Sequence, residues 1–375
     1  MSTLHILMVC KSLPWNFNGG IQSHTWELSK ALADQKHKVT VLTAGSIYNK
    51  EVRYVKDAVE IIEIRYLPGR YLKPFHVAAE EIFFNLAVRK WLFKNQHNYS
   101  IIHLQGRSGM FFTSDSSAKI VTTIHGLIDV ENAVERKSIG SLIYRKVASR
   151  LERLNISKAN ALITVSQELN RLVGVNENTI VIPNGVNPVE QKASQNKDRR
   201  LLFVGRIHPI KGYDTLLHAL ALTSSSIHLD IVGDGPMYRD MTNLIAQLGL
   251  EKRVRLHGNV PQEQVFNFMQ TAFALILPSV FEGQGLVLLE ANLYGIPVIA
   301  SDIPSIKEVV EHGENGLLCS PNEPSEFAEA ITKLFKNTEL AHSIGQTGHR
   351  KVLEGYTWQQ IANKTVEVYH KTLAA

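Results

Sequence analysis

The sequence predicts an α/β protein of two domains, each built on a doubly wound parallel sheet. Short apolar runs with the length of buried parallel strands alternate along the chain with stretches of helical character. Such alternation favours parallel sheets joined by right-handed crossovers. The 375 residues are enough for two hydrophobic cores, and a polar stretch without apolar periodicity interrupts the alternation near residue 190. We therefore place the first domain at 1–187, a linker at 188–198 and the second domain at 199–355.

The first domain opens with a strand at 4–10, a helix at 21–35 and a strand at 38–44, which together form a βαβ unit. The loop after the first strand lacks G-x-G-x-x-G, so the dinucleotide fingerprint is missing. Gly19 and Gly20 instead precede the helix, where they allow backbone N–H groups to approach a phosphate. The alternative is a simple turn before a helix.

Four further strands are predicted in the first domain, at 101–104, 120–124, 161–165 and 180–182. His125 directly follows the second of these, at the carboxyl end where open α/β sheets bind ligands. A histidine in this position can equally be a structural hydrogen-bonding residue. Ser166 has the position of a helix N-cap.

The second domain begins with a strand at 201–204, which ends in Gly205-Arg206, and Lys211-Gly212 stands just before a helix. A guanidinium and an ammonium group at a strand-to-helix junction are suited to a diphosphate. The alternative is a pair of solvated surface cations. The alternation then includes strands near 228–232 and at 272–277 and 298–300, with helices at 237–248 and 286–294, and it continues through the segments 306–311 and 327–335.

The stretch Phe281–Glu290, FEGQGLVLLE, follows a buried strand and opens a helix. Glu282 lies in the loop, Gly285 marks the turn, and Glu290 lies inside the helix. Free N–H groups at such a helix end form an anion site. Gly285 and Glu290 are about 7.5 Å apart along the helix axis, which suits a ligand with a phosphate at the helix end and a ribose further along. Alternatively, the two acids are incidental to a βαβ unit.

The segment EGQGLVLLEA, followed by YGIPVIAS, resembles the Glu-x7-Glu motif of retaining glycosyltransferases of family 4, which have the GT-B fold. The resemblance extends over nearly the whole chain. It implies two Rossmann-like domains that face each other across a cleft, the first completed by an amphipathic C-terminal helix at 356–375. It also implies transfer of a hexose-type sugar from a UDP-, GDP- or ADP-sugar. The acceptor class stays open between a glycan, a lipid-linked glycan and a small molecule.

By this resemblance Glu290 holds the donor ribose, Glu282 lies beside the transferred sugar, and Arg206 and Lys211 bind the diphosphate. Gln284 departs from the family, which usually has an aromatic residue there, so it bears on donor identity. The implied catalytic residues are Glu282, His125, Arg206 and Lys211. The implied donor-binding residues are Gly19, Gly20, Arg206, Lys211, Gly258, Val260, Gln284, Gly285, Leu286 and Glu290.

A front-face attack through an oxocarbenium-like state would need no protein nucleophile, and cations and helix ends would stabilise the leaving diphosphate. No Asp-x-Asp motif is present, so we expect neither a metal requirement nor another cofactor. Two alternatives use the same fold: a nucleotide-sugar epimerase or a glycan phosphorylase, and a catalytically silent partner that binds sugar nucleotides.

The net charge of +5 and the pI near 9.0 favour an anionic ligand or surface. The basic, aromatic-rich stretch 70–94 and the basic helix at 136–153 either contact an anionic membrane surface or pack on the core with a solvated charged face. No nucleic-acid-binding motif accompanies them. Cys10 and Cys319 lie in apolar contexts, which predicts buried free thiols. Since no signal peptide precedes the first strand, we expect a cytoplasmic enzyme, with peripheral contact at the inner face of the membrane left open.

Overall fold

The computed structural model describes residues 3–17, 19–68, 76–114, 118–127, 139–174, 178–188 and 199–375. The chain divides into two compact units: Met1–Gly185 with Trp358–Ala375, and Val186–Thr357. The sequence placed the first boundary after residue 187 and the start of the terminal helix at 356. Most of the predicted linker, 189–198, lies outside the described residues, as do 70–75 and 136–138 of the two basic stretches.

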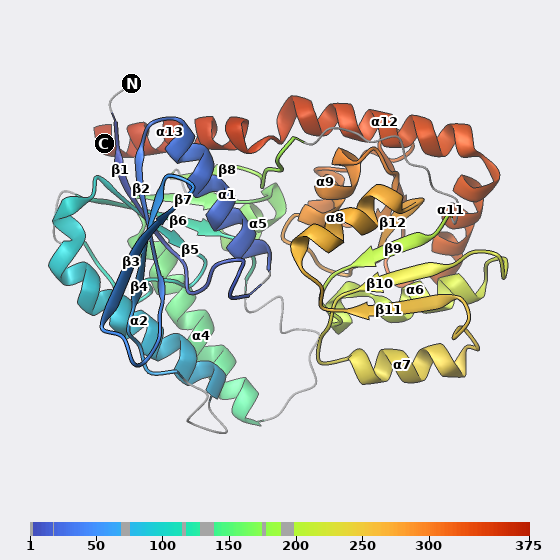
Figure 1. Ribbon diagram of the computed structural model, residues 1–375, viewed down its shortest axis with the longest axis horizontal. Helices are drawn as coiled ribbons and strands as arrows, with labels where there is room; N and C mark the ends of the chain where they lie inside the picture. Colours follow the sequence, from blue (N-terminus) through green and yellow to red (C-terminus); the bar gives the residue numbers. More distant parts are fainter. Residues whose placement is uncertain are drawn as a thin grey trace. The chain divides into compact units, whose positions relative to one another are not determined.

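The first unit contains one eight-stranded sheet of order β3-β4-β2-β1-β5-β6-β7-β8 (Figure 1). From β1 the chain proceeds outward on one side to β2 and β4 and then returns to add β5 to β8 on the other, which is a doubly wound order. The strands are β1 His5–Val9, β2 Lys38–Ala44, β3 Glu51–Lys56, β4 Val59–Ile64, β5 Ile101–Gln105, β6 Lys119–Ile124, β7 Ala161–Thr164 and β8 Thr179–Val181.

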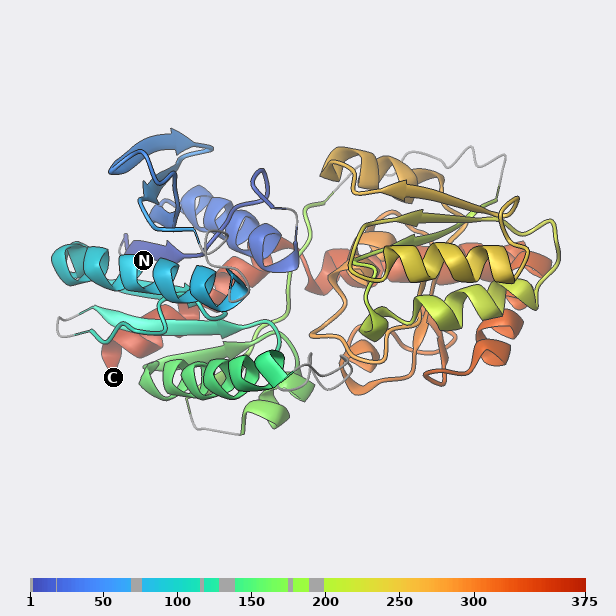
Figure 2. The ribbon, with the colours of Figure 1, turned by 90° about the horizontal axis from the view of Figure 1, so that it is seen from below.

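Helices cover both faces of this sheet. The period-2 alternation of β1 sends Ile6 and Met8 into one core with Trp358, and Leu7 into a second core with Phe84. The terminal helix α13 and α1 pack on the first of these faces, and α2 and α4 run side by side over the other (Figures 1 and 2). The helices are α1 Gly20–Asp34, α2 His76–Asn95, η2 Gln96–Asn98, α4 Ile139–Lys158, α5 Gln167–Val173 and α13 Trp358–Ala374.

The antiparallel hairpin of β3 and β4 was not predicted. Its two turn residues, Asp57 and Ala58, both have positive φ angles, 48° and 62°. Such turns normally contain Asn-Gly or Asp-Gly, because glycine adopts this conformation without strain. An alanine in the second position removes the usual sequence signal, although the two flanking segments alternate as strands do.

The second unit contains a six-stranded parallel sheet of order β11-β10-β9-β12-β13-β14. This is again a doubly wound order, which confirms the predicted fold of this half. The strands are β9 Leu201–Val204, β10 Leu229–Val232, β11 Val254–Gly258, β12 Ala274–Leu277, β13 Val298–Ser301 and β14 Gly316–Cys319. The sequence had named no strand in the positions of β11 and β14.

Helix α7 lies below β11 in Figure 1 and packs beside α6, and α8 and α9 lie above β9. A single hydrophobic cluster fills the unit. The helices are η4 Pro209–Lys211, α6 Tyr213–Ala221, α7 Tyr238–Gln247, α8 Gln262–Thr271, α9 Leu286–Leu293, α10 Pro304–Lys307, α11 Pro324–Lys336 and α12 Thr338–Gly355. Of these, α12 was not predicted.

Two smaller predictions are confirmed. Cys10 and Cys319 are buried free thiols, and the Ser166 hydroxyl caps α5 by accepting a hydrogen bond from the Leu169 N–H at 3.2 Å. Within the described part of the chain, no helix combines the length and apolarity that a bilayer crossing requires.

Candidate functional site

The order of strands in the second unit reverses between β9 and β12, and ligands of open α/β sheets bind outside such a switch point. The loops after these two strands are held together by a hydrogen bond from Val280 N to Ile210 O at 2.9 Å. Gly212 has a left-handed φ of 62°, and a Cβ there would lie 2.0 Å from the Pro278 carbonyl oxygen. Only glycine therefore permits this approach of the two loops.

The two loops bring Lys211 and Glu282 into contact. Lys211 Nζ lies 2.5 Å from Glu282 Oε1, and the Ser279 hydroxyl donates to the same oxygen at 2.8 Å. Glu282 is only 8% exposed, and a buried carboxylate needs a charged or hydrogen-bonding partner. The ammonium group of Lys211 and the hydroxyl of Ser279 are these partners. The sequence had assigned these two side chains to different parts of a donor, whereas in the ligand-free protein they form one ion pair.

Arg206 follows β9 on the same edge of the sheet but is exposed. It forms no hydrogen bond or ion pair with any residue of the described chain. Its guanidinium thus keeps all its donors available, while the ammonium of Lys211 is already neutralised. Of the two predicted phosphate ligands, Arg206 is the more exposed to solvent.

Helix α9 begins at the switch point. Its N-cap, Gly285, has φ 82° and offers no side chain to the first-turn N–H groups; Leu288 N donates to Gly285 O at 2.9 Å, and the N–H groups before it are left for an anion. Leu286 is the first residue of the helix. Glu290 lies one turn further along, half-buried, with Gln262 Nε2 at 3.5 Å from its Oε1. Burial raises the pKa of Glu290 to about 7.

Three other predicted donor residues flank this region. Gly258 ends β11 with φ 64° and open space around its Cα. Val260 is half-buried against the hydrophobic cluster. Gln284 is only 3% exposed, so a ligand has little of its side chain to contact.

In the first unit, Gly19 and Gly20 lie at the start of α1, in the loop after β1. The strand order of this sheet reverses between β1 and β5, so this loop too borders a switch point. Gly19 is the N-cap in an extended conformation, without a side chain to occupy the helix end. A Cβ on Gly20 would meet nothing within 4 Å, so space remains beside the backbone there.

His125 belongs to a cluster of neutral side chains at the carboxyl ends of β5 and β6. Its Nε2 lies 2.9 Å from Gln105 Oε1, and its ring lies edge-on to that of His24, with centroids 4.5 Å apart. His24 Nδ1 lies 2.7 Å from Asn184 Oδ1. Burial, and then the nearby His24 and His103, hold the pKa of His125 well below its ordinary value, so the imidazole is neutral.

Sequence reasoning had missed Ser279, Gln262 and His24. Ser279 stands two residues after the end of β12, so its position near a strand end was a usable signal. Gln262 had none, because its proximity to Glu290 depends on how α8 packs beside α9. His24 lies within α1, and its contact with Asn184 is not visible in the sequence because the two residues are 160 positions apart.

Two family models match the chain. The model described as "Glycosyltransferase Family 4" matches residues 18–190, and "Glycosyl transferases group 1" matches residues 188–351. The solved structure of sucrose-phosphate synthase from Thermosynechococcus elongatus superimposes with a TM-score of 0.84 at 23% identity, covering 99% of each chain. The chain is a glycosyltransferase of the GT-B fold.

Further relatives are similar to this glycosyltransferase over its whole length. An uncharacterized glycosyltransferase of Methanocaldococcus jannaschii is 27% identical, with 98% of each chain covered. The structure of Anabaena HepE in complex with UDP and glucose has a TM-score of 0.75 at 21% identity, covering 97% of this chain and 98% of that one. Among the described residues of this glycosyltransferase, no group of three or more His, Cys, Asp or Glu side chains is placed to hold a metal ion.

Proposed function

We propose that this glycosyltransferase moves a hexose-type sugar, with retention of configuration, from a nucleoside diphosphate sugar to a glycan, lipid-linked glycan or small-molecule acceptor. The observation that supports this most is the cluster of Lys211, Glu282 and Ser279 at the switch point of the second unit, with Glu290 one turn into α9. The cluster combines positive charge, a helix end and two carboxylates, which are groups suited to a diphosphate and to sugar and ribose hydroxyls. Anabaena HepE, a structural neighbour, was solved with UDP and glucose.

In this proposal Arg206 and Lys211 stabilise the leaving diphosphate together with the N-terminus of α9. Negative charge grows on the diphosphate as the glycosidic bond breaks, so groups fixed around it lower the barrier. Lys211 would turn from Glu282 toward the phosphates when the donor enters. Glu282 would then accept hydrogen bonds from sugar hydroxyls.

Glu290 is proposed to accept hydrogen bonds from the ribose hydroxyls. Its carboxyl group has no cation beside it among the described residues, and the 3.5 Å contact with Gln262 is long for a hydrogen bond. A pair of hydroxyl donors would therefore satisfy acceptors that the empty protein leaves weakly bonded.

In the first unit, His125 is proposed to contact the donor sugar and Gly19-Gly20 to face the diphosphate. A neutral imidazole can offer one donor and one acceptor to sugar hydroxyls. Its Nε2 is already engaged with Gln105, so Nδ1 is the nitrogen left for a ligand.

A nucleotide panel and a product analysis test the proposal. Thermal shift with UDP, GDP, ADP and their sugar derivatives should show stabilisation by one base series, because a ligand that binds only the folded state raises its stability. NMR of the sugar released or transferred should show the anomeric configuration of the donor. No shift with any nucleotide would reject the donor class, and an inverted product would reject retention. For the variant Lys211→Ala, the control is Lys252→Ala, which removes an exposed lysine outside the site.

We also propose that the exposed face of α2 contacts anionic lipid. Leu86 and Phe93, 46% and 69% exposed, lie two turns apart on this helix, and Arg89, Lys90 and Lys94 lie beside them around a shallow groove. Apolar side chains interleaved with cations are the pattern of helices that lie on an anionic membrane surface.

Vesicle sedimentation tests this contact. Phosphatidylglycerol vesicles should retain the protein, phosphatidylcholine vesicles should not, and L86S/F93S should abolish retention. Leu222→Ser, which removes a leucine that is 65% exposed from the second unit, is the control and should bind as wild type does. Equal retention of wild type and L86S/F93S would refute the proposal.

A further inference from the structure

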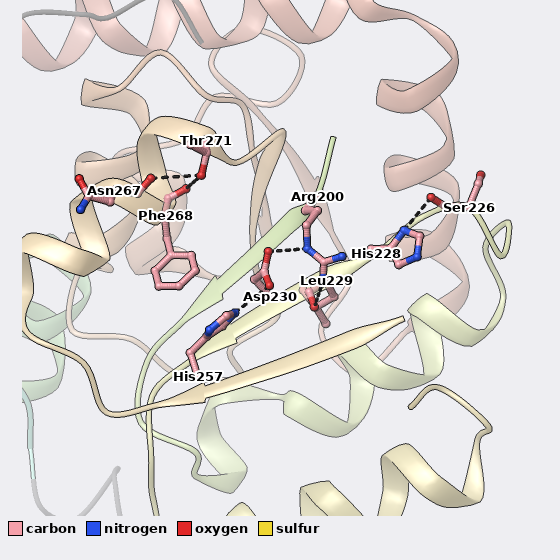
Figure 3. A network of polar contacts seen from close by, with 9 residues as sticks. All are labelled: Arg200, Ser226, His228, Leu229, Asp230, His257, Asn267, Phe268 and Thr271. Carbon is pink, nitrogen blue, oxygen red and sulfur yellow. Dashed lines mark hydrogen bonds and ion pairs between the residues drawn. The ribbon is translucent and has the colours of Figure 1, made fainter. Parts of the chain in front are cut away.

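A buried aspartate in the second unit joins three strands through its side chain. Asp230, on β10, is 8% exposed. Arg200 Nε donates to Asp230 Oδ2 at 2.6 Å from the residue before β9, and His257 Nε2 lies 2.8 Å from Asp230 Oδ1 from β11 (Figure 3). Arg200 Nη2 also donates to Leu229 O at 3.0 Å. Because a carboxylate oxygen only accepts, His257 Nε2 is the donor in its contact.

His257 lies at an irregularity of the sheet. Ile231 pairs with Leu256 and Val232 pairs with Gly258, so His257 is an extra residue between two paired positions. Such a bulge bends its strand, and bulges are common next to active sites, where they redirect the chain. The imidazole, held by Asp230 on one side, also packs on the Phe268 ring of α8, with centroids 4.4 Å apart.

The chain after this bulge leads to Gln262, which lies beside Glu290. Gly258 O accepts from Gly233 N at 2.8 Å, which fixes the end of β11. The loop 258–261 follows, and α8 begins at Gln262, the residue whose amide lies 3.5 Å from Glu290. His257, on the strand before this loop, thus contacts β10 through Asp230 and the helix after the loop through Phe268.

We propose that Arg200, Asp230 and His257 are positioning residues that set the loop 258–261 and Gln262 against the nucleoside of the donor. Buried charged groups are costly unless they are fully paired, and replacing the whole set by well-packed apolar residues would often be neutral for stability. The function of the present set is to fix the bulge, and through it the wall of the nucleoside site. The inference rests on the proposed donor class, since it deepens the assignment of that site.

The network is separate from the diphosphate groups. Arg206 and Lys211 lie in the loop after β9 and Glu282 in the loop after β12, whereas His257 acts on the loop after β11. If the loop 258–261 is less well fixed, the binding of the base and ribose should therefore weaken, while the binding of the diphosphate should not change.

The test is calorimetry with the nucleoside diphosphate that binds the wild type and, in parallel, with inorganic diphosphate. His257→Phe keeps the packing on Phe268 but removes the donor, and it should weaken nucleoside diphosphate binding about tenfold while leaving inorganic diphosphate binding unchanged. His257→Gln, which retains an N–H donor, should restore most of the affinity. In donor hydrolysis, His257→Phe should raise KM and leave kcat within about twofold.

Arg253→Met is the matched control. Arg253 also bonds neighbouring segments, through Ile227 O at 2.9 Å and Thr223 Oγ1 at 2.7 Å, but it does so at the beginning of β11. Its loss should lower thermal stability without changing nucleotide affinity. Circular dichroism establishes that each variant is folded, and Asp230→Asn provides a second variant if His257→Phe is not.

The outcomes separate the two proposals. If the wild type binds no nucleoside diphosphate, the proposed donor class is wrong. If it binds one and folded His257→Phe and Asp230→Asn both bind equally well, the positioning role alone is wrong. A parallel loss for inorganic diphosphate, or the same loss in Arg253→Met, would also overturn it, because the effect would then be general destabilisation.

Discussion

Lys211 Nζ lies 2.5 Å from Glu282 Oε1, so the cation expected on the diphosphate and the carboxylate expected beside the sugar neutralise each other in the ligand-free protein. The pair is formed by loops that follow two different strands and is 71 residues apart in the chain. A donor would separate it by giving each partner a new one, the phosphates for Lys211 and hydroxyls for Glu282. On donor entry each of the two charged groups would thus exchange its present partner for a new one, and neither charge would be buried without a partner.

Removal of either phosphate ligand should slow transfer. Lys211→Ala and Arg206→Ala should each lower kcat about 10²–10³-fold, since one electrostatic partner of the developing charge is lost. Only Lys211→Ala should also lower the melting temperature, because it leaves the buried Glu282 without its cation, whereas Arg206 is exposed. Steady-state kinetics and thermal denaturation measure both effects. Near-normal turnover in both variants would rule out the assignment.

The two glutamates should differ in what they affect. Glu290→Ala should raise the donor KM and weaken nucleoside diphosphate binding, because ribose contacts exist in both ground and transition states. Glu282→Ala should lower kcat and should not weaken nucleoside diphosphate binding, since it frees Lys211 for the phosphates. Calorimetry with the free nucleoside diphosphate distinguishes them, with the exposed Glu263→Ala on α8 as control. Tight binding by Glu290→Ala would show that another group holds the ribose.

Nucleotide affinity should depend on pH through Glu290. Burial raises its pKa to about 7, so the carboxyl group of the empty protein is partly protonated at neutral pH. If ribose hydroxyls donate to the ionised form, binding releases a proton, and affinity falls as pH drops below about 7, by up to about tenfold per pH unit. Calorimetry in buffers of different ionisation enthalpy measures the release. Glu290→Gln should remove the pH dependence of nucleotide affinity. If the dependence is unchanged in that variant, it arises from another group.

The first unit should lose stability in mild acid. Burial lowers the pKa of His24 to about 4 and of His103 to about 3. The unfolded chain takes up protons near pH ~6.5, so the stability supplied by the neutral histidines is complete above that pH and declines toward pH ~4. All four tryptophans, Trp15, Trp26, Trp91 and Trp358, belong to this unit, so their fluorescence reports its unfolding alone.

The histidine prediction has a simple comparison. In His103→Gln the ring that bridges Tyr369 Oη and Thr123 Oγ1, both at 2.6 Å, is lost, so the variant should be less stable at pH ~7 but show a shallower fall toward pH ~5. A wild-type melting temperature that is the same at both pH values would contradict the assignment of neutral, buried histidines.

Transfer should survive chelation, because no paired-aspartate motif is present in the sequence. Activity after EDTA treatment should match the untreated enzyme. Loss that Mn²⁺ or Mg²⁺ restores would reveal a metal-dependent step.

The sequence by itself determined the fold class and most elements, because buried parallel strands are short apolar runs and the helices between them follow local signals. It placed β9 at its observed limits and put Glu282 in a loop and Glu290 in a helix. The hairpin of β3 and β4 was not predicted, because the positive φ angles of Asp57 and Ala58 are enforced only by the surrounding sheet.

The tertiary structure alone decided which side chains meet. Lys211 and Glu282 contact each other because β9 and β12 are neighbours at the point where the strand order reverses, and no local pattern encodes that adjacency. The contacts of Asp230 with Arg200 and His257 likewise depend on strand pairing and on a one-residue bulge. Local propensity fixes the elements of a chain, whereas partners distant in sequence are set by the packing of whole sheets.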